Sequence, residues 1–383
     1  MAQFGIYIHW PFCESKCPYC DFNSHVGKSI NHASWRQAYR TELFRYAAET
    51  SNRIVTSIFF GGGTPSLMDP ETLAEIIKVI QDHWQVSNDL EVTMEANPSS
   101  AESRVLDAFR SAGVNRLSLG VQSLEDESLM ILGRQHSAAE AIEAAKIVAQ
   151  TFERYSLDFI YARPNQTVAG WSEELERALE LAGDHISVYQ LTIEPGTQFH
   201  KERVAPADEV LSVKLYEITQ EILSEAGLLP YEISNHARPG QECSQNLLYW
   251  QGEDYVGLGP GAHGRLTGIA PNGSLKTEAI QEIRLPEKWL EAVQTKGVGT
   301  HKRNKLLFDQ RRDELVLMGL RLSEGIDTER FFRLTGRRLF DNLEEDKLDR
   351  LVESGFLNRS CNNVRLTPRG LRCLDSVISA LLV

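Results

Sequence analysis

Three cysteines lie close together near the start of the chain, in the stretch CESKCPYC at residues 13–20. The chain has six cysteines in all, so half of them fall within this short stretch. Three neighbouring thiols cannot all pair with one another, and clustered cysteines in a cytosolic protein more often bind metal or do redox chemistry. The C-x3-C-x2-C spacing of Cys13, Cys17 and Cys20 therefore predicts a metal centre rather than a disulfide framework.

Two kinds of metal centre can be weighed for this motif. Structural zinc normally takes four protein ligands, commonly in paired C-x2-C units, and the motif offers three. A cubane [4Fe-4S] cluster suits three thiolates, because each thiolate holds one iron and the fourth iron stays open for a small ligand. The spacing favours the iron–sulfur cluster, and a zinc-stabilised binding protein is the alternative.

The elements that position these cysteines follow a regular alternation. Short apolar segments predict strands at 5–9, 55–60, 90–95, 115–120, 156–161 and 185–192. Longer amphipathic segments predict helices at 33–50, 70–84, 101–112, 137–150, 170–182 and 207–227. This alternation is typical of β–α units around a parallel sheet. Six units are fewer than the eight of a closed barrel, so we predict an α/β fold with a partial, open TIM-like (β/α)6 barrel.

Residues with useful chemistry recur where the predicted strands end. Cys13 follows the first strand, the glycine-rich stretch at 61–65 follows the second, and Glu95 closes the third. Gln122 follows the fourth strand, and Asp158 lies within the fifth. Because barrel folds of this kind carry their chemistry at the C-terminal ends of the strands, these residues are expected to share one site.

The stretch LEVTMEANP strengthens this expectation through its alternation. Leu90 and its apolar partners two and four residues further on face one way, whereas Glu91, Thr93 and Glu95 face the other way. We expect these polar side chains to gather at the mouth of the barrel.

The pattern changes after residue 268. The stretch at 268–284 predicts a loop into a second module, followed by helices at 286–296, 309–321, 327–335 and 343–354. A short hairpin and a final helix come next. We therefore predict two domains, 1–268 and 285–383, of which the second is mainly helical and winged-helix-like.

Charge and hydropathy narrow the range of partners. The net charge is -13, and the residues from 301 onward carry 16 Lys and Arg against 13 Asp and Glu. This balance argues against a general nucleic-acid surface, so no nucleic acid is expected as a partner. The N-terminus lacks the basic and apolar pattern of a secretory signal, and no apolar run is long enough for a membrane span. We expect a cytoplasmic protein.

Two longer stretches, IYIHWPFCESKCPYCDFN and YWQGEDYVGLGPGAHG, carry a family resemblance. The sequence resembles the radical S-adenosylmethionine superfamily, in the branch of oxygen-independent coproporphyrinogen oxidases and HemW-type heme chaperones. The resemblance covers roughly the first 265 residues. It implies that Cys13, Cys17 and Cys20 hold a [4Fe-4S] cluster, whose open iron binds S-adenosylmethionine. The residues that match cofactor-contacting positions are Tyr7, Tyr19, Gly62, Gly63, Thr64, Glu95, Gln122, Arg134 and Asp158.

The resemblance also separates two branches of function. The oxidases carry a fourth cysteine where this chain has Phe22, and they have a longer arm before the motif than the 12 residues that precede Cys13 here. Both differences favour the HemW-type branch, which implies a chaperone that binds heme as cargo and delivers it to a heme-accepting protein. An oxygen-independent coproporphyrinogen III oxidase or another radical enzyme is the alternative, so whether the protein is an enzyme stays open. Peripheral contact with membrane proteins and a homodimer are further expectations.

One departure from the family pattern concerns the heme ligand. The branch usually shows H-N-x-x-Y-W, and this chain has QNLLYW, with Gln245 in the histidine position. Glutamine offers no imidazole, so His236, His263 or Cys243 could take its place. Each of these three residues could equally have a purely structural role. If an imidazole at position 245 binds heme in the family, Gln245→His is expected to preserve or tighten heme binding.

A second departure lies in the stretch DFIYARPNQT, where Arg163 and Asn165 replace the leucine and glycine of a common family turn. Asparagine tolerates the left-handed backbone conformation that a turn glycine supplies, so we expect the fold to be preserved.

Overall fold

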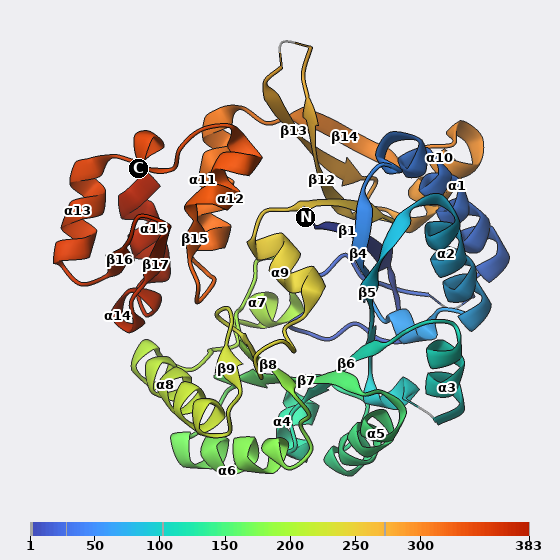
Figure 1. Ribbon diagram of the computed structural model, residues 1–383. Helices are drawn as coiled ribbons and strands as arrows, with labels where there is room; N and C mark the ends of the chain where they lie inside the picture. The colour runs from blue at the N-terminus through green and yellow to red at the C-terminus, as the bar shows by residue number, and fades with distance from the viewer. Residues whose placement is uncertain (1–2, 28, 102, 272, 383) are drawn as a thin grey trace.

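A single curved sheet organises most of the molecule. The computed structural model describes residues 3–27, 29–101, 103–271 and 273–382. Within these residues twelve strands join one sheet, in the order β14-β13-β12-β11-β1-β4-β5-β6-β7-β8-β10-β9. Its central strands are β1 (Phe4–Trp10), β4 (Ile54–Gly62), β5 (Gln85–Ala96), β6 (Arg116–Gln122), β7 (Arg154–Tyr161) and β8 (His185–Gln190). Each of these six is parallel to its neighbour, and together they curve into an open ring (Figure 1). The predicted open parallel barrel is confirmed.

Helices cover the outer face of this ring (Figure 1). They are α1 (His32–Thr50), α2 (Pro70–His83), α3 (Ser103–Ser111), α4 (Asp126–Ile131), α5 (Ala138–Thr151), α6 (Val168–Leu179) and α8 (Glu209–Glu225). The short helix α7 (Gln198–Glu202) lies next to the cysteine loop instead, where the Phe199 N–H donates to the Pro18 carbonyl at 3.0 Å. Helix α2 shows how the sequence builds the covering helices. The carboxylate of Asp69 caps its first turn, Pro70 occupies a position that needs no N–H donor, and its buried residues include Leu73, Ile76 and Ile80. The spacing of these residues places them on one helix face, which packs against the sheet.

The central strands alternate between an apolar outer face and a polar inner face. In β7, Leu157 and Phe159 belong to the hydrophobic core under the helices. The side chains of Ser156 and Asp158, which alternate with these two residues, point into the barrel. There the Ser156 hydroxyl donates a hydrogen bond of 3.1 Å to the Asp158 carboxylate. The core therefore lies between the sheet and the helices, and the barrel interior is left for polar groups.

One edge of the sheet contradicts the sequence prediction. Strands β11 (Asp254–Leu258), β12 (His263–Ile269), β13 (Leu275–Glu282) and β14 (Thr300–Lys305) extend the sheet beyond β1. The predicted loop at 268–284 is wrong, because β12 and β13 form an antiparallel hairpin there. The charged residues of β13 made this segment resemble a loop. In the structure Glu278 pairs with Lys276 and with Arg303 of β14, while Thr277 and Ile280 are buried. Two short strands, β10 (Asn235–Ala237) and β9 (Leu229–Pro230), end the opposite edge.

The packing of aromatic side chains bears on the domain boundary. Helix α10 (Pro286–Lys296) belongs to the first hydrophobic core, where Trp289 stacks on Trp35 of α1 with ring centroids 5.6 Å apart. A second core is formed by residues from Leu315 onward. We therefore propose that the division between the two units falls between β14 and the next helix, α11 (Phe308–Gly319), rather than at residue 285.

The C-terminal unit is mainly helical with a small sheet. Its remaining helices are α12 (Thr328–Thr335), α13 (Glu345–Glu353), α14 (Pro368–Leu371) and α15 (Leu374–Leu382). Its antiparallel sheet has the order β15-β17-β16 and consists of β15 (Ile326–Asp327), β16 (Leu357–Arg359) and β17 (Asn363–Leu366). The predicted hairpin and final helix are present. Across the described parts of the chain, we find no helix with the length and apolar character that a bilayer span requires.

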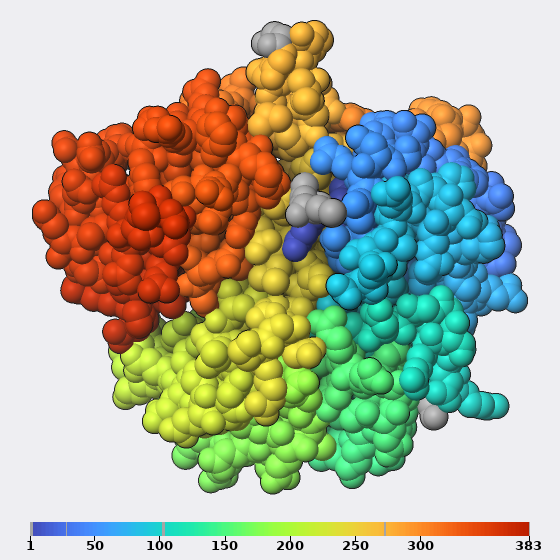
Figure 2. Space-filling model, viewed as in Figure 1, coloured from blue at the N-terminus to red at the C-terminus, as the bar shows by residue number. Residues whose placement is uncertain are grey.

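Helix α9 (Ser244–Trp250) fills the end of the barrel at which the strands begin (Figure 1). Its Gln245 is fully buried and accepts a hydrogen bond of 2.6 Å from Ser57 of β4. The C-terminal unit closes over the far end of this helix: Arg311 donates to the carbonyl of Gly252, and the Arg321 guanidinium lies 4.8 Å from the centre of the Trp250 ring. Figure 2 shows the C-terminal unit packed beside this segment on the same face.

Candidate cofactor site

The three clustered cysteines line one cavity of about 350 Å³ at the end of the barrel opposite α9. Cys13 ends β2 (Phe12–Cys13), which pairs with β3 (His25–Val26) and so fixes both ends of the cysteine loop. Cys17 and Cys20 lie within the loop, which is closed by a 3.1 Å backbone hydrogen bond between them. All three thiols are free and half-buried. The predicted convergence is therefore present in the geometry.

The other three cysteines lie elsewhere. Cys243 is buried at the closed end of the barrel, and Cys361 and Cys373 are exposed on the C-terminal unit. In the described parts of the chain, no group of three or more His, Cys, Asp or Glu side chains is placed to hold a single metal ion. A cubane cluster needs a wider arrangement than a single ion, because each thiolate binds a different iron atom.

The glycine-rich stretch at the end of β4 is held tightly by its neighbours. Gly62 has a φ of +114°, and a Cβ atom there would lie 2.6 Å from the His9 ring. A Cβ atom on Gly63 would lie 2.6 Å from the carbonyl oxygen of Phe12. Glycine is therefore required for the loop to pack against the cysteine segment. Gly62, Gly63 and Thr64 all line the cavity beside the cysteines.

The backbone amides of this stretch are already used. The N–H of Gly62 donates to Glu95 at 3.1 Å, that of Gly63 donates to the Trp10 carbonyl at 2.7 Å, and that of Thr64 donates to the Phe12 carbonyl at 2.8 Å. A ligand at this loop can therefore take hydrogen bonds only from other groups. The carbonyl oxygens of the loop are the backbone atoms suited to accept a hydrogen bond from a ligand's ammonium group.

Two carboxylates face the cavity from neighbouring parts of the barrel. Burial, together with the nearby charge of Asp158, raises the pKa of Glu95 to about 8. Burial also raises the pKa of Asp158, while hydrogen bonds from serines oppose the shift. Ser118 donates to Asp158 at 2.8 Å and Ser156 donates to it at 3.1 Å. Among the described residues neither carboxyl group forms an ion pair, although the buried Arg116 lies near enough to Asp158 to lower its pKa. The two groups are suited to a cationic, hydroxyl-rich ligand.

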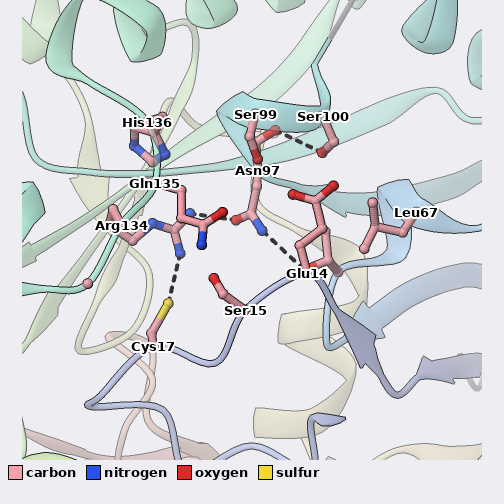
Figure 3. Close-up of a pocket in the computed structure, with 12 residues that line it drawn as sticks. Glu14, Ser15, Cys17, Leu67, Asn97, Ser99, Ser100, Arg134, Gln135 and His136 are labelled. Carbon is pink, nitrogen blue, oxygen red and sulfur yellow. Dashed lines mark hydrogen bonds between the residues drawn. The ribbon is translucent and has the colours of Figure 1, made fainter. Parts of the chain in front are cut away.

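Arg134 follows the short helix α4 and lines the cofactor cavity. Figure 3 shows it between Cys17 and Asn97 in a smaller pocket that shares these residues with the cavity. Its Nη1 donates to the Cys17 sulfur at 3.4 Å, and its Nη2 donates to the Asn97 side chain at 2.6 Å. Its Nε is a buried donor with no hydrogen-bond partner among the described residues. A guanidinium beside these sulfurs is placed to offset the negative charge of metal-bound thiolates, and its Nε–H is a further donor at the site.

The remaining predicted contacts lie around the same opening. Gln122 lines the cavity at the end of β6 and has a φ of 70°, which is uncommon for a residue other than glycine. Tyr19 also lines it, with its ring 6.3 Å from that of Phe199. Tyr7 lines an adjoining chamber instead, where its hydroxyl is 3.0 Å from His9 Nδ1. The structure thus brings every predicted residue to the mouth of the barrel, with Tyr7 one chamber away.

Asn97, Ser118 and Tyr189 are among the lining residues that were not predicted from the sequence. Asn97 donates to Thr64 at 3.1 Å and so joins the glycine-rich stretch to Arg134. Ser118 supports Asp158, and Tyr189 of β8 lines the cavity with 41% of its surface exposed. Asn97 could have been found, because it is the first residue after the end of β5 and lies two positions beyond Glu95. The other two carry a signal only once the strand register is known.

Glu91 corrects the expectation that its whole strand face lies at the mouth. It lies at the closed end of the barrel, where it pairs with Arg154 at 2.7 Å and accepts from the Ser244 N–H at 2.9 Å. Thr93 is also fully buried inside the barrel. β5 is long enough to reach from one end of the barrel to the other, so residues on one face of it serve different ends.

The candidate heme ligands are placed very differently from one another. Gln245, Cys243 and His236 are all buried, and His236 Nε2 is 3.0 Å from the Gln220 side chain. Position 245 cannot present a ligand at the surface, so the expectation that an imidazole there strengthens heme binding is not supported by the fold. His263, at the start of β12, is exposed and lines the chamber that adjoins the cofactor cavity.

The second departure from the family pattern fits the backbone. Asn165 has a φ of 63°, as predicted for a residue that replaces a turn glycine. Arg163 is buried and forms an ion pair with the buried Glu174 of α6, which also accepts from Ser123 at 2.5 Å. A paired and hydrogen-bonded charge can occupy the place of a leucine.

Comparisons with known proteins agree with this architecture. A family model described as the radical SAM superfamily matches residues 7–182, and one described as the HemN C-terminal domain matches residues 309–373. The Escherichia coli coproporphyrinogen III oxidase HemN, described as a radical SAM enzyme, superposes with a TM-score of 0.82. That match has 20% sequence identity and covers 99% of this chain and 90% of the other. The fold is therefore that of a radical SAM open barrel with a C-terminal helical unit.

Sequence relatives cover the whole chain. The protein "Radical S-adenosyl methionine domain-containing protein 1, mitochondrial" of Danio rerio is 36% identical over 390 residues, covering 100% of this chain and 87% of the relative. The heme chaperone HemW of Haemophilus influenzae is 34% identical over 391 residues, covering 100% of this chain and 98% of the relative. The protein belongs to the radical SAM superfamily, in the branch that contains the HemW heme chaperones.

Proposed function

We propose that this protein is a heme chaperone that holds a [4Fe-4S] cluster and S-adenosylmethionine at the mouth of its barrel and delivers heme to an acceptor protein. The observation that carries the proposal is the cavity in which Cys13, Cys17 and Cys20 meet the strand-end residues. Heme is proposed as the cargo because relatives that match the whole chain are named heme chaperones.

The cysteine loop is suited to be the cluster site. Its three thiols are free and share one cavity, and the guanidinium of Arg134 offsets the negative charge that thiolates bring. Bound there, the cluster supplies an open iron site for the amino and carboxylate groups of S-adenosylmethionine. The protein's part is to hold the three sulfurs in place and to exclude other ligands.

The rest of the cavity supports S-adenosylmethionine as the second ligand. We assign its ammonium group to the carbonyl oxygens of the glycine-rich stretch, because the N–H groups there are occupied. Glu95 and Asp158 can accept hydrogen bonds from ribose hydroxyls and oppose the positive charge of the sulfonium group. Gln122, Tyr7 and Tyr19 complete the proposed contacts, and Arg134 is a donor for the carboxylate.

Heme delivery is favoured over porphyrinogen oxidation by two features. Phe22 occupies the position of the additional oxidase cysteine, and its ring is 60% exposed at the rim of the cavity. An exposed aromatic ring beside an open chamber suits a flat apolar cargo that must later leave. A heme-accepting protein is the proposed partner, and a cytoplasmic location stays a prediction.

Anaerobic reconstitution followed by two parallel assays tests the proposal. The reconstituted protein is expected to bind iron, sulfide, S-adenosylmethionine and heme, and to leave coproporphyrinogen unchanged when reductant is supplied. Conversion of coproporphyrinogen to protoporphyrinogen would overturn the chaperone assignment in favour of the oxidase. Protein that takes up zinc and no sulfide would overturn the cluster assignment.

A further inference from the structure

A second chamber adjoins the cofactor cavity. It has a volume of about 380 Å³ and lies between the cysteine segment and the edge formed by β12 and β13. The residues that line it are Tyr7, His9, Phe22, Asn23, Gly62, Glu95, Gly261, His263, Gln281 and Arg284. Phe22, Gly62 and Glu95 also line the cofactor cavity, so the two spaces share a wall.

The wall of this chamber is fixed by Asn23. Its side-chain amide donates to the carbonyl of Pro260 at 2.9 Å and to that of Arg284 at 2.8 Å. Its own carbonyl oxygen is 3.0 Å from Nε2 of His9. Three segments that are far apart in the sequence are therefore joined at one residue. This clamp sets the width of the chamber.

Three exposed side chains at the chamber are available to a ligand: His263, Arg284 and Phe22. Within the described part of the chain, neither the imidazole of His263 nor the guanidinium of Arg284 has a hydrogen-bond or ion-pair partner, and both residues are exposed. The ring of Phe22 is 60% exposed. By contrast, the imidazole of His9 contacts both Tyr7 and Asn23, so it is not available to a ligand.

Each of these free groups suits one part of an iron porphyrin. An imidazole is a common ligand to heme iron, a guanidinium pairs with a carboxylate, and an aromatic ring packs against a flat apolar face. The chamber walls partly shield the His263 ring from solvent although the residue is exposed, and this partial desolvation, with the nearby cations Arg265 and Arg284, lowers the pKa of His263 and keeps its nitrogen lone pair free. The chamber is near the lower end of the roughly 300–1,000 Å³ range of small-molecule sites, so part of a macrocycle would stay outside it.

We propose that heme docks at this chamber, with His263 as a ligand to its iron, Arg284 as the partner of a propionate carboxylate and Phe22 against the macrocycle. This assignment rests on the proposed heme-carrying function and adds a location to it. Incomplete enclosure is consistent with cargo that is handed on. Because Glu95 and Gly62 belong to both walls, heme and S-adenosylmethionine would be neighbours.

The test is a titration of hemin into the anaerobically reconstituted protein, followed by absorption spectroscopy. His263→Ala is expected to weaken binding by roughly tenfold or more and to change the Soret band, since an iron ligand is lost. Added imidazole should restore the spectrum of this variant. His83→Ala is the matched control, because His83 is an exposed histidine on α2, a helix that contributes no residue to the chamber.

Arg284 is tested with a modified ligand. Arg284→Gln is expected to lower hemin affinity several-fold, whereas heme with esterified propionates should bind wild type and this variant equally. If wild type binds hemin and His263→Ala gives the same spectrum and affinity, the proposed location is overturned while the heme-carrying function stands. If wild type binds no hemin, the proposed function itself fails.

Discussion

Two glutamates on one strand show how the ends of the barrel differ. Glu91 and Glu95 lie on the same face of β5, four residues apart. At the closed end, Glu91 is held by Arg154, by the Ser244 N–H and by the Cys243 thiol at 3.5 Å. At the open end, Glu95 accepts one backbone N–H and faces the cofactor cavity, where burial raises its pKa to about 8.

The difference teaches what separates a structural carboxylate from one that is ready for a ligand. Burial alone does not decide it, since both groups lie inside the barrel. The number and charge of the partners decide it, because a buried carboxylate without a cation is stabilised when a cationic ligand arrives. The closed end of the barrel therefore supports the fold, and the open end is available for binding.

The largest effect is expected at the open end, on the cluster. Replacing Cys13, Cys17 or Cys20 by Ala should abolish the cluster, because each thiolate holds one iron. Iron and sulfide analysis should give about four of each per wild-type chain and close to none per variant. Cys361→Ala is the control, since this cysteine is exposed on the C-terminal unit. Loss of the cluster in the control, or its retention in the motif variants, would contradict the assignment.

The next effect concerns the cofactor. Glu95→Ala and Asp158→Ala should each weaken S-adenosylmethionine binding by roughly tenfold or more, because a charged hydrogen bond contributes about 1.5–3 kcal/mol. Isothermal titration calorimetry of the reconstituted proteins measures this, and the iron content should stay at the wild-type level. Unchanged affinity in both variants would remove the strand-end carboxylates from the site.

Glu91 supplies the opposite result at the closed end. Glu91→Ala should lower the free energy of unfolding by about 1–3 kcal/mol, because Arg154 and the Ser244 N–H lose their partner. Cofactor affinity should stay at the wild-type value. Glu153→Ala, at an exposed position beside Arg154, is the control for denaturant unfolding. A loss of cofactor binding with unchanged stability would show that the comparison is wrong.

A smaller effect follows from the pKa of Glu95. Its pKa is about 8 in the folded protein against a reference of 4.5, so between these values the folded state binds more protons than the unfolded state. The free energy of unfolding attributable to this group therefore falls as the pH rises from about 4.5 to about 8. Glu95→Gln should lack this contribution. Urea unfolding of both proteins across that range checks it, and parallel pH profiles would contradict it.

The smallest effect is expected for position 245. Gln245→His should leave hemin affinity within about twofold of wild type, because the side chain is enclosed at the closed end and meets Ser57. Hemin titration beside His263→Ala makes the contrast direct. A clear gain in affinity would mean that α9 leaves the barrel when heme binds.

Much of this arrangement could be predicted from the sequence. The alternation of strands and helices predicted the open barrel, and the cysteine spacing with the strand-end rule indicated the cysteines, Glu95, Gln122 and Asp158. The family resemblance added Tyr7, Tyr19 and Arg134. These signals are local, because each depends on a few neighbouring residues. The hairpin of β12 and β13 was missed, since its charged residues are neutralised by partners such as Arg303, which lies 25 residues beyond Glu278.

The roles of single polar residues were harder to predict. No feature of the sequence indicates at which end of the barrel Glu91 and Gln245 lie. Their burial depends on α9 entering the barrel, and that contact joins Ser57 to a residue 188 positions further along the chain. A pattern of period two gives the face of a strand and not the depth at which a side chain lies.

The position of α9 has a consequence for the order of events. Since this helix fills one end of the barrel, heme seated at the proposed chamber and S-adenosylmethionine in its cavity would use the same opening. An acceptor protein that covers this opening to collect heme would also hold the neighbouring cofactor in place. Cofactor exchange and heme transfer could then not occur at the same time. A saturating concentration of acceptor protein should therefore slow the release of labelled S-adenosylmethionine.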